Sequence, residues 1–169
     1  MKINAGTSEV FDQNTREYDQ WFEKHANMYQ SEIMAIEQAL PKNKSGIEIG
    51  VGTGRFAMPF NIKYGIEPSE NMARVAEQKG IKVYRAYAED LPIGDAAFDF
   101  VLMVTTVCFL TDIPKAFSEI HRILKPGEKS CWLSSTRTAN SAANTKRKNP
   151  QANFTGMPIF ILLTNLRKC

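Results

Sequence analysis

A loop with three glycines at alternate positions follows a short apolar run. The stretch IEIGVGTGRF spans Ile47–Phe56 and carries Gly50, Gly52 and Gly54. Each glycine costs conformational entropy on folding, so such a cluster indicates a tight turn or a close approach of the backbone to another group. A glycine turn between a buried strand and a helix is typical of parallel sheets that bind ligands beyond the strand ends. The loop therefore predicts an α/β fold with a ligand site at this position.

The remainder of the chain alternates strand patterns with helix patterns. Four segments are predicted as strands, and they are IEIG (47–50), IKYGIE (62–67), IKVYRAY (81–87) and FDFVLMVT (98–105). The last of these is an almost continuous apolar run, which indicates burial on both faces of the sheet. Strands that alternate with helices favour a parallel sheet covered on both faces. We therefore expect a Rossmann-like, doubly wound, mostly parallel sheet with helices on both faces.

Apolar residues at helical spacing predict the helices. Two helices are expected before Pro41, one through Phe11–His25 and one through Tyr29–Leu40. RFAMPF (55–60) predicts one or two helical turns after the glycines, and Ser69 is expected to cap a helix that stops at Gly80. Thr111 or Asp112 is expected to cap a last helix that ends at KPG (125–127). The order is thus α-α-β-α-β-α-β-β-α.

An acid at the end of the second strand narrows the ligand. Glu67 lies 17 residues after Gly50, where an acid can accept hydrogen bonds from both hydroxyls of a ribose. The glycine loop and this acid predict a ligand that carries a nucleoside. Two classes compete, of which one is a dinucleotide bound by the G-x-G-x-x-G pattern. Its third glycine would fall at Arg55, and an arginine fits poorly where helix and strand must pack closely.

The pattern present is instead E-x-G-x-G-x-G from Glu48 to Gly54, and it resembles motif I of class I S-adenosylmethionine-dependent methyltransferases. The resemblance continues in order along the chain, over roughly residues 10–127. GIEPSENM (65–72) resembles the second-strand segment of the family, and AEDLPIGDAAFDFVLM (88–103) its adenine loop and fourth strand. EIHRILKPGE (119–128) is similar to its E-x-x-R-x-L-K-P-G-G helix end.

The N-terminal part has a resemblance of its own. FDQNTREYDQWF (11–22) resembles the Y-D-x-W-F lid helix of the branch that includes quinone-biosynthesis C-methyltransferases. This implies a lid over the cofactor, to which Tyr18 and Trp21 would belong. The same side chains are also typical of simple packing within an N-terminal helix, and the two interpretations stay open.

The resemblance implies roles for individual residues in binding S-adenosylmethionine. The methionine part would meet the backbone of the glycine loop, with Glu48 orienting the loop or contacting the ammonium group, and Glu67 would bind the ribose hydroxyls. Ala88 and Glu89 would meet the adenine, Pro68 and Met72 would form an apolar wall, and Val104 to Thr106 would lie under the sulfonium. The implied cofactor-binding residues are Glu48, Gly50, Gly52, Thr53, Gly54, Glu67, Pro68, Met72, Ala88, Glu89, Val104 and Thr105.

No catalytic residue is assigned, because alignment of methyl donor and acceptor can supply a large share of the rate. Only an acceptor that must lose a proton needs a base, and the two histidines are the candidates by residue type. His121 is expected on the surface, whereas His25 lies near the lid. Cys108 is expected to be a buried small residue rather than a nucleophile. Cys108, Cys131 and Cys169 form no metal pattern, so no metal is predicted.

The chain departs from the family pattern after Gly127. Residues 1–128 hold all 18 acids and have a net charge of −4, whereas residues 129–169 have a net charge of +7 and no acid. A basic segment of this kind is typical of nucleic-acid binding. Apart from CWLSS (131–135), a candidate stub of a fifth strand, it has no strand or helix period. A shifted reading frame near codon 128 explains both features without a nucleic-acid partner, and a divergent basic tail is the alternative.

Three segments are therefore expected: lid helices over 1–45, a cofactor-binding core over 46–127 and an aberrant basic tail over 128–169, with the fold truncated or disordered after about residue 127. An apolar edge of the fourth strand would then stay open. The resemblance implies a methyltransferase with a small-molecule acceptor, and a non-catalytic cofactor-binding remnant or an NAD-dependent oxidoreductase are the alternatives. With no signal peptide and no membrane-spanning run, a cytoplasmic location without membrane contact is expected. The sequence does not define an oligomeric state.

Overall fold

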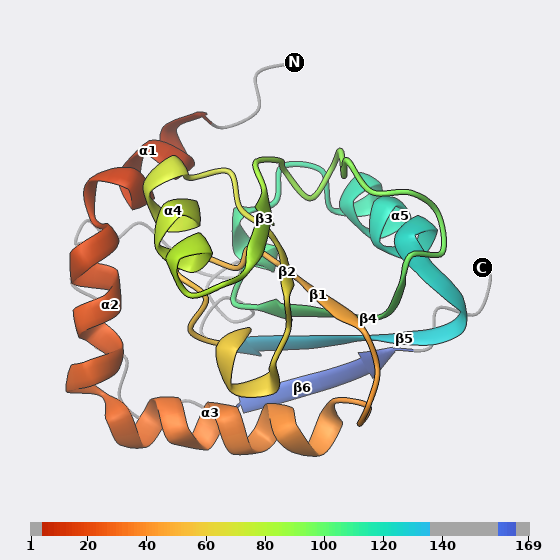
Figure 1. Ribbon diagram of the computed structural model, residues 1–169, viewed down its shortest axis with the longest axis horizontal. Helices are drawn as coiled ribbons and strands as arrows, with labels where there is room; N and C mark the ends of the chain where they lie inside the picture. The colour runs from red at the N-terminus through yellow and green to blue at the C-terminus, as the bar shows by residue number, and fades with distance from the viewer. Residues whose placement is uncertain (1–4, 136–158, 165–169) are drawn as a thin grey trace, which may run out of the picture.

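A computed structural model describes residues 5–135 and 159–164 of the 169-residue chain. One mixed sheet has the strand order β3-β2-β1-β4-β5-β6 (Figure 1). The strands are β1 Gly46–Ile49, β2 Tyr64–Ile66, β3 Lys82–Tyr84, β4 Phe98–Val104, β5 Leu124–Ser135 and β6 Ile159–Thr164. The α-helices are α1 Ala5–Gln13, α2 Thr15–Lys24, α3 Ala26–Ala39, α4 Glu70–Gln78 and α5 Ile113–Ile123, and two 3₁₀ turns are η1 Met58–Phe60 and η2 Val107–Phe109.

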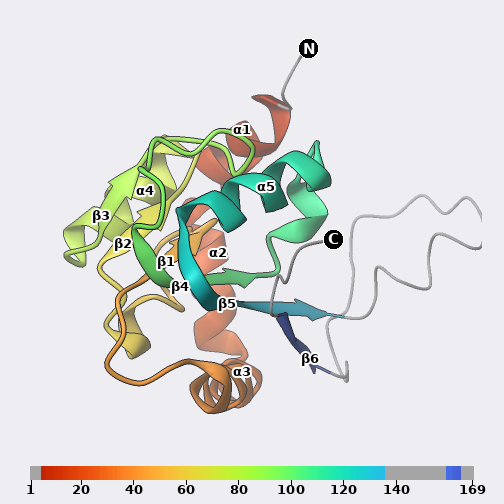
Figure 2. The same cartoon turned by 90° about the vertical axis from the view of Figure 1, so that its right-hand side faces the viewer.

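Helices cover both faces of the sheet, as the alternating pattern predicts. On one face α2, α3 and α4 pack against a cluster that includes Phe100 and Leu102 of β4. On the other face α5 packs against Val101 and Met103 of the same strand. Figure 2 shows α3 and α5 on opposite sides of the sheet. The strand β4 is thus buried from both faces, which confirms the interpretation of its apolar run.

Strands β1 to β5 pair in parallel, with β4 inserted beside β1. The chain therefore leaves β1 toward β2 on one side and reaches β4 on the other, so the strand order reverses at β1. Loops that follow β1 and β4 meet at this point, which is where α/β sheets of this type bind ligands.

The N-terminal segment contains three helices rather than the two that were expected. The break between α1 and α2 falls at Asn14, whose side-chain amide donates to the carbonyl oxygen of Val10 at 2.7 Å. Side chains that bond the backbone in this way compete with helix continuation. The second break falls at His25, which ends α2 and precedes α3.

The segment after the glycines is the short helical piece that RFAMPF predicts. It reduces to the single turn η1, which contains Pro59 and ends at Asn61 with φ of 55°. A left-handed residue at this position stops the turn and returns the chain to β2. The brief connection explains how β2 can follow the glycine loop so soon.

The expectation of an open edge along β4 is wrong. Strand β5 runs to Ser135 and pairs with β4 from Phe98 to Val104, and β6 adds an antiparallel neighbour to β5. CWLSS is therefore the end of a full strand, because pairing to β4 satisfies backbone groups that a propensity pattern alone does not reveal. The other residues of the expected tail, 136–158 and 165–169, lie outside the described part of the chain.

Candidate functional site

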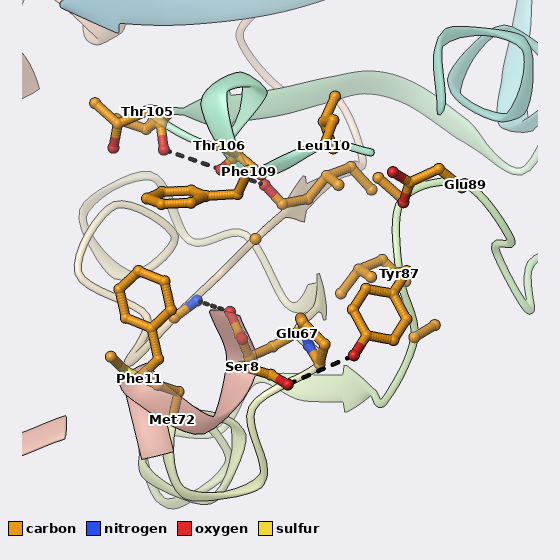
Figure 3. A pocket seen from close by; sticks show the side chains of 18 of the residues that line it. Ser8, Phe11, Glu67, Met72, Tyr87, Glu89, Thr105, Thr106, Phe109 and Leu110 are labelled. Atoms are coloured by element: carbon orange, nitrogen blue, oxygen red, sulfur yellow. Dashed lines mark hydrogen bonds between the residues drawn. The ribbon is translucent and has the colours of Figure 1, made fainter. Parts of the chain in front are cut away.

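An open cavity lies at the carboxyl ends of β1, β2 and β4. Its empty space, including the open mouth, is about 850 Å³. Its walls come from the glycine loop, the loops after β2, β3 and β4, and the N-terminal helices (Figure 3). The lining residues are Ser8, Phe11, Tyr18, Ile49, Gly50, Gly52, Ile66, Glu67, Pro68, Met72, Ala86, Tyr87, Ala88, Glu89, Val104, Thr105, Thr106, Phe109, Leu110 and Thr111.

The glycine loop turns sharply at its first glycine. Gly50 has φ of 73°, and its amide donates to the carbonyl oxygen of Ile66 at 2.8 Å. A Cβ atom at Gly50 would lie 2.5 Å from Oγ1 of Thr106, a residue of the loop after β4. The first glycine is therefore required by the fold itself.

The second glycine faces the cavity. Gly52 has φ of 53°, and a Cβ atom there would lie 3.4 Å from the Tyr18 hydroxyl, which is an ordinary contact. Packing thus leaves room for a small side chain, so the missing Cβ serves the cavity more than the core. This is the geometry expected where a ligand approaches the backbone.

Glu67 joins the glycine loop to the start of α4. Its Oε2 accepts from the Gly52 amide at 2.9 Å, and its Oε1 accepts from the Ser69 amide at 2.9 Å. Burial raises the pKa of Glu67, and the two amide donors partly oppose this shift. Each carboxylate oxygen can accept a further hydrogen bond, so the side chain can still bind hydroxyl groups in the cavity.

Glu48 does not line the cavity. Its side chain is fully buried under the segment that follows the glycine loop, and its Oε2 has no hydrogen-bond partner within the described residues. Burial, with the nearby Glu67 charge, raises the pKa of Glu48 well above its ordinary value, while a bond from the Ala57 amide lowers it. Of the two roles considered for Glu48, this position favours support of the loop.

Thr53 and Gly54 also lie outside the cavity. The hydroxyl of Thr53 donates to Oδ1 of Asp19 in α2 at 2.6 Å. A Cβ atom at Gly54 would lie 2.6 Å from Cδ1 of Ile81, so this glycine allows the loop to pack against the segment before β3. The alternate glycines thus have separate tasks, and only Gly50 and Gly52 border the cavity.

The loop after β3 brings Ala88 and Glu89 to the cavity. Oε1 of Glu89 accepts from the amide and the hydroxyl of Thr111, at 2.8 and 3.0 Å. Burial alone would raise the pKa of Glu89, but the bonds from Thr111 and Asp112 lower it below its ordinary value. Glu89 therefore connects the predicted adenine loop to the loop that follows β4.

An arginine of α5 holds the next part of that loop. Arg122 donates to the carbonyl oxygens of Leu91 and Ile93 at 3.0 and 2.7 Å, and its guanidinium also pairs with Glu119 and Asp95. The amide of Leu91 in turn donates to Glu119 at 2.9 Å. The E-x-x-R segment of α5 thus fixes the backbone at Leu91 and Ile93, in the same loop as Ala88 and Glu89.

The end of β4 supplies the floor of the cavity. Thr105 has φ of 51°, which is uncommon for a β-branched residue and marks a constrained turn. The hydroxyl of Thr106 donates to the carbonyl oxygens of Ile49 and Val104, at 3.2 and 3.0 Å. Val104 and both threonines line the cavity, in the place expected for them.

The N-terminal helices close one side. Tyr18 lines the cavity, whereas Trp21 packs on His25 with ring centroids 4.5 Å apart and is not a lining residue. Phe11 also lines the cavity and meets Phe109 edge to face, with centroids 5.3 Å apart. The lid interpretation therefore fits Tyr18, and simple packing fits Trp21.

The remaining candidates by residue type lie elsewhere. The Nδ1 atom of His25 lies 2.8 Å from the carbonyl oxygen of Trp21, and His121 is exposed in the last turn of α5. The expectation that Cys108 is buried is wrong, because it is exposed in η2 with its Sγ donating to the Thr105 carbonyl oxygen. β4 ends at Val104, and Cys108 lies beyond it in η2, outside the sheet.

Several lining residues were not predicted from the sequence, namely Ser8, Phe11, Ile49, Ile66, Ala86, Tyr87, Phe109, Leu110 and Thr111. Ile49 and Ile66 end the strands beside Gly50 and Glu67, so strand-end position was an available signal. Phe109 and Leu110 lie five to six residues after Val104, and no periodicity marks them.

No helix within residues 5–135 is long and apolar enough to cross a membrane. In the same part of the chain, no group of three or more His, Cys, Asp or Glu side chains is placed to hold a metal ion.

The cavity suits a nucleoside that carries an amino acid. The backbone at Gly50 and Gly52 borders one end without a side chain, and Glu67 provides a carboxylate for hydroxyl groups. Apolar side chains of Ile66 and Met72 line the same cavity, where a base can pack. These residues fit the parts of S-adenosylmethionine.

Comparison with known proteins identifies the family. A family model described as a methyltransferase domain matches residues 47–131. An uncharacterized protein of Methanocaldococcus jannaschii is 50% identical over 71% of this chain and 58% of its own length. A demethylmenaquinone methyltransferase of Geobacillus kaustophilus is 26% identical over 76% of this chain and 62% of its own length.

Solved structures agree. A crystal structure of an S-adenosylmethionine-dependent methyltransferase of Thermotoga maritima, described as a possible histamine N-methyltransferase, superposes with a TM-score of 0.72 at 47% identity. The match covers 74% of this chain and 60% of that one. The chain thus spans less than two thirds of the length of these relatives. It belongs to the methyltransferase domain family, whose fold and relatives imply S-adenosylmethionine as the cofactor.

Proposed function

We propose that this protein transfers a methyl group from S-adenosylmethionine to a small-molecule acceptor. The observation that carries the proposal is the pairing of Glu67 with the Gly52 amide at 2.9 Å on the wall of the cavity. This pair joins the two sequence features that predict a nucleoside ligand, the glycine loop and the acid after β2. The bound cofactor would supply an electrophilic methyl group and a good leaving group.

The residues that would hold the cofactor follow from their positions. Glu67 would accept hydrogen bonds from the ribose hydroxyls through lone pairs that Gly52 and Ser69 leave free. The backbone at Gly50 and Gly52 would face the amino-acid part, as proposed for the loop. Pro68, Met72 and Ala88 would border the adenine.

Thr53, Gly54 and Glu48 would act from behind the loop, because they lie outside the cavity. Glu89 would act mainly by joining two loops, since its Oε1 is occupied by Thr111 and Asp112. Val104 and Thr105 would lie beside the transferred methyl group. These assignments extend the roles that the family resemblance implies.

The acceptor end of the cavity contains aromatic rings and hydroxyl groups. Phe11 and Phe109 lie on one side, next to Thr105 and Thr106 (Figure 3). Among the described lining residues, the charged side chains are Glu67 and Glu89, and neither a histidine nor a lysine is present. These residues would therefore act by aligning the acceptor and excluding water, a contribution of about 7–11 kcal/mol in favourable cases.

Two named relatives support a small acceptor. The relative from Geobacillus kaustophilus bears the name of a quinone methyltransferase, and the Thermotoga maritima structure bears that of a possible amine methyltransferase. Both names refer to small-molecule acceptors. The acceptor of this chain is therefore proposed only as a small molecule, whose atom is to be identified by product analysis.

Calorimetry tests the cofactor, with S-adenosylhomocysteine and NAD as separate ligands. We expect micromolar-range binding of S-adenosylhomocysteine and no binding of NAD, and binding of NAD alone would overturn the proposal. A labelled-cofactor assay with a panel of quinone precursors, amines and phenols then tests transfer. Binding of S-adenosylhomocysteine without turnover on any acceptor would favour the non-catalytic remnant.

The frame-shift hypothesis for residues 128–169 is tested separately. Translation of the other two frames after codon 127 should give a strand, a helix and a hairpin that continue the family pattern. If neither frame does so, the frame-shift hypothesis is wrong. The acceptor panel is therefore best run on this chain and on the frame-corrected chain.

A further inference from the structure

A carboxylate of α2 contacts the glycine loop from outside the cavity. Oδ1 of Asp19 accepts from the Thr53 hydroxyl at 2.6 Å and from Nε of Arg55 at 2.8 Å. The Arg55 guanidinium also donates to the Asp19 carbonyl oxygen at 3.0 Å. One residue of α2 thus binds Thr53 and Arg55, which lie one and three residues after Gly52.

A lysine that directly follows α4 completes this cluster. Nζ of Lys79 donates to the Thr53 carbonyl oxygen at 2.7 Å and lies 3.7 Å from Oδ2 of Asp19. The side chains of Asp19 and Arg55 are only 26% and 22% exposed. A partly buried, multiply bonded pair of this kind restricts the loop more than a solvated surface pair does.

The residue before Asp19 lies over the cavity side of the same loop. The Tyr18 hydroxyl would be 3.4 Å from a Cβ atom at Gly52, and Tyr18 lines the cavity. Adjacent residues of α2 therefore contact both sides of the glycine loop. The loop cannot shift relative to α2 without breaking the Asp19 bonds.

A second carboxylate ties α1 to the next cofactor loop. Oδ1 of Asp12 accepts from the Ser69 hydroxyl at 2.6 Å and from the Asn71 amide at 2.9 Å. The amide of the same serine donates to Glu67. Each of the first two helices thus uses an aspartate to hold a loop that borders the cavity.

We propose that Asp19 is a positioning residue, which holds the glycine loop in its cofactor-binding conformation through Thr53 and Arg55. This inference rests on the proposed function. Asp19 touches no part of the cavity itself and acts through the loop.

The test compares Asp19→Asn and Thr53→Val with Glu23→Gln. Glu23 is the matched control, because it lies on the same helix and also bonds Arg55, at 3.3 Å, but its side chain is 70% exposed. We expect Asp19→Asn and Thr53→Val each to weaken S-adenosylhomocysteine binding about tenfold. Asparagine keeps Oδ1 but loses the charge that strengthens its bonds to Thr53 and Arg55, and valine removes the donor hydroxyl. The double variant should lose little more than either single variant, and Glu23→Gln should bind as the wild type does.

Hydrogen exchange of the peptide covering residues 50–56 gives a readout without cofactor. Exchange there should be faster in Asp19→Asn than in Glu23→Gln, with the melting temperatures of the two variants close together. Stopped-flow fluorescence of Trp21, in a Trp132→Phe background, should show faster release of S-adenosylhomocysteine from Asp19→Asn.

Each of these measurements can support or contradict the positioning role of Asp19. Additive losses in the double variant, or loop exchange equal to that of the control, would overturn the positioning role of Asp19. A wild-type protein that binds no S-adenosylhomocysteine would contradict the proposed function, and the exchange comparison would still decide whether Asp19 holds the loop.

Discussion

Oε2 of Glu67 lies 2.9 Å from the amide nitrogen of Gly52, so the acid that directly follows β2 holds the loop that follows β1. The residues are 15 positions apart in the chain and follow the neighbouring strands β1 and β2. Because the carboxylate both fixes the loop and faces the cavity, a change at Glu67 alters two features of the site at once.

Replacement of Glu67 by glutamine should weaken cofactor binding. The glutamine amide group would face either the Gly52 or the Ser69 amide, so one buried donor would lose its acceptor. Loss of such a bond to a charged group costs about 1.5–3 kcal/mol, which corresponds to roughly 10- to 100-fold in the affinity for S-adenosylhomocysteine. Calorimetric titration measures this change.

Glu70→Gln is the control for this change. Glu70 lies three residues further on and pairs with Arg74 and Arg85 on the exposed side of α4. We expect its affinity for S-adenosylhomocysteine to equal that of the wild type. Equal affinities for Glu67→Gln and Glu70→Gln would contradict the role of Glu67.

Alanine at the first two glycines should separate folding from binding. Gly52→Ala places its Cβ in ordinary contact with Tyr18, so the stability loss should be that of a left-handed alanine, about 1–2 kcal/mol. Gly50→Ala adds a collision with Thr106 and should lose more. Urea denaturation gives the two stabilities. Gly52→Ala should still lose most of its S-adenosylhomocysteine affinity, and retention of that affinity would show that the cofactor does not approach Gly52.

The sequence predicted those parts of the site that depend on local pattern. The apolar run of β4 predicted burial on both faces of the sheet. The position of Glu67 after β2 predicted an acid at the strand ends, near the point where the strand order reverses at β1. The glycine loop could be located for the same reason. The different roles of its glycines, with Gly54 against Ile81 and Gly52 toward the cavity, could not be predicted, because spacing does not show which side of the backbone is crowded.

Long-range contacts were the part that the sequence did not reveal. Asp19 bonds Thr53 across 34 residues, and Phe11 meets Phe109 although nothing in their local patterns links them. Strand β5 was likewise underestimated, since its pairing with β4 is a tertiary contact and not a propensity. Contacts of this kind depend on how the N-terminal helices and the β4–α5 loop pack around the sheet.

Arg122→Lys should destabilise the adenine loop. A lysine keeps the charge but cannot reach Leu91, Ile93 and Glu119 together, because it lacks the planar fork of the guanidinium. We expect the free energy of unfolding to fall by about 1–3 kcal/mol. Chemical denaturation measures this free energy. The control is Arg74→Lys on the exposed side of α4, whose free energy of unfolding should differ from that of the wild type by less than about 0.5 kcal/mol. A loss as small as the control's would show that Arg122 is not needed to hold the loop.

Glu32→Gln should change how stability depends on pH. Burial raises the pKa of Glu32 on α3 to about 7 from its ordinary 4.5. Between these values the folded state keeps a proton that the unfolded state has released, so wild-type stability falls as the pH rises. Glutamine removes this loss, and Glu32→Gln should be more stable than the wild type above pH 7 by about 1–2 kcal/mol, a value reduced for the partial exposure of the side chain. The difference should disappear near pH 4.

Urea denaturation at pH 4, 5.5 and 7.5 measures the stability difference between Glu32→Gln and the wild type, with exposed Glu37→Gln on the same helix as the control. A gap between Glu32→Gln and the wild type that stays constant from pH 4 to 7.5 would show that Glu32 titrates normally in the folded protein.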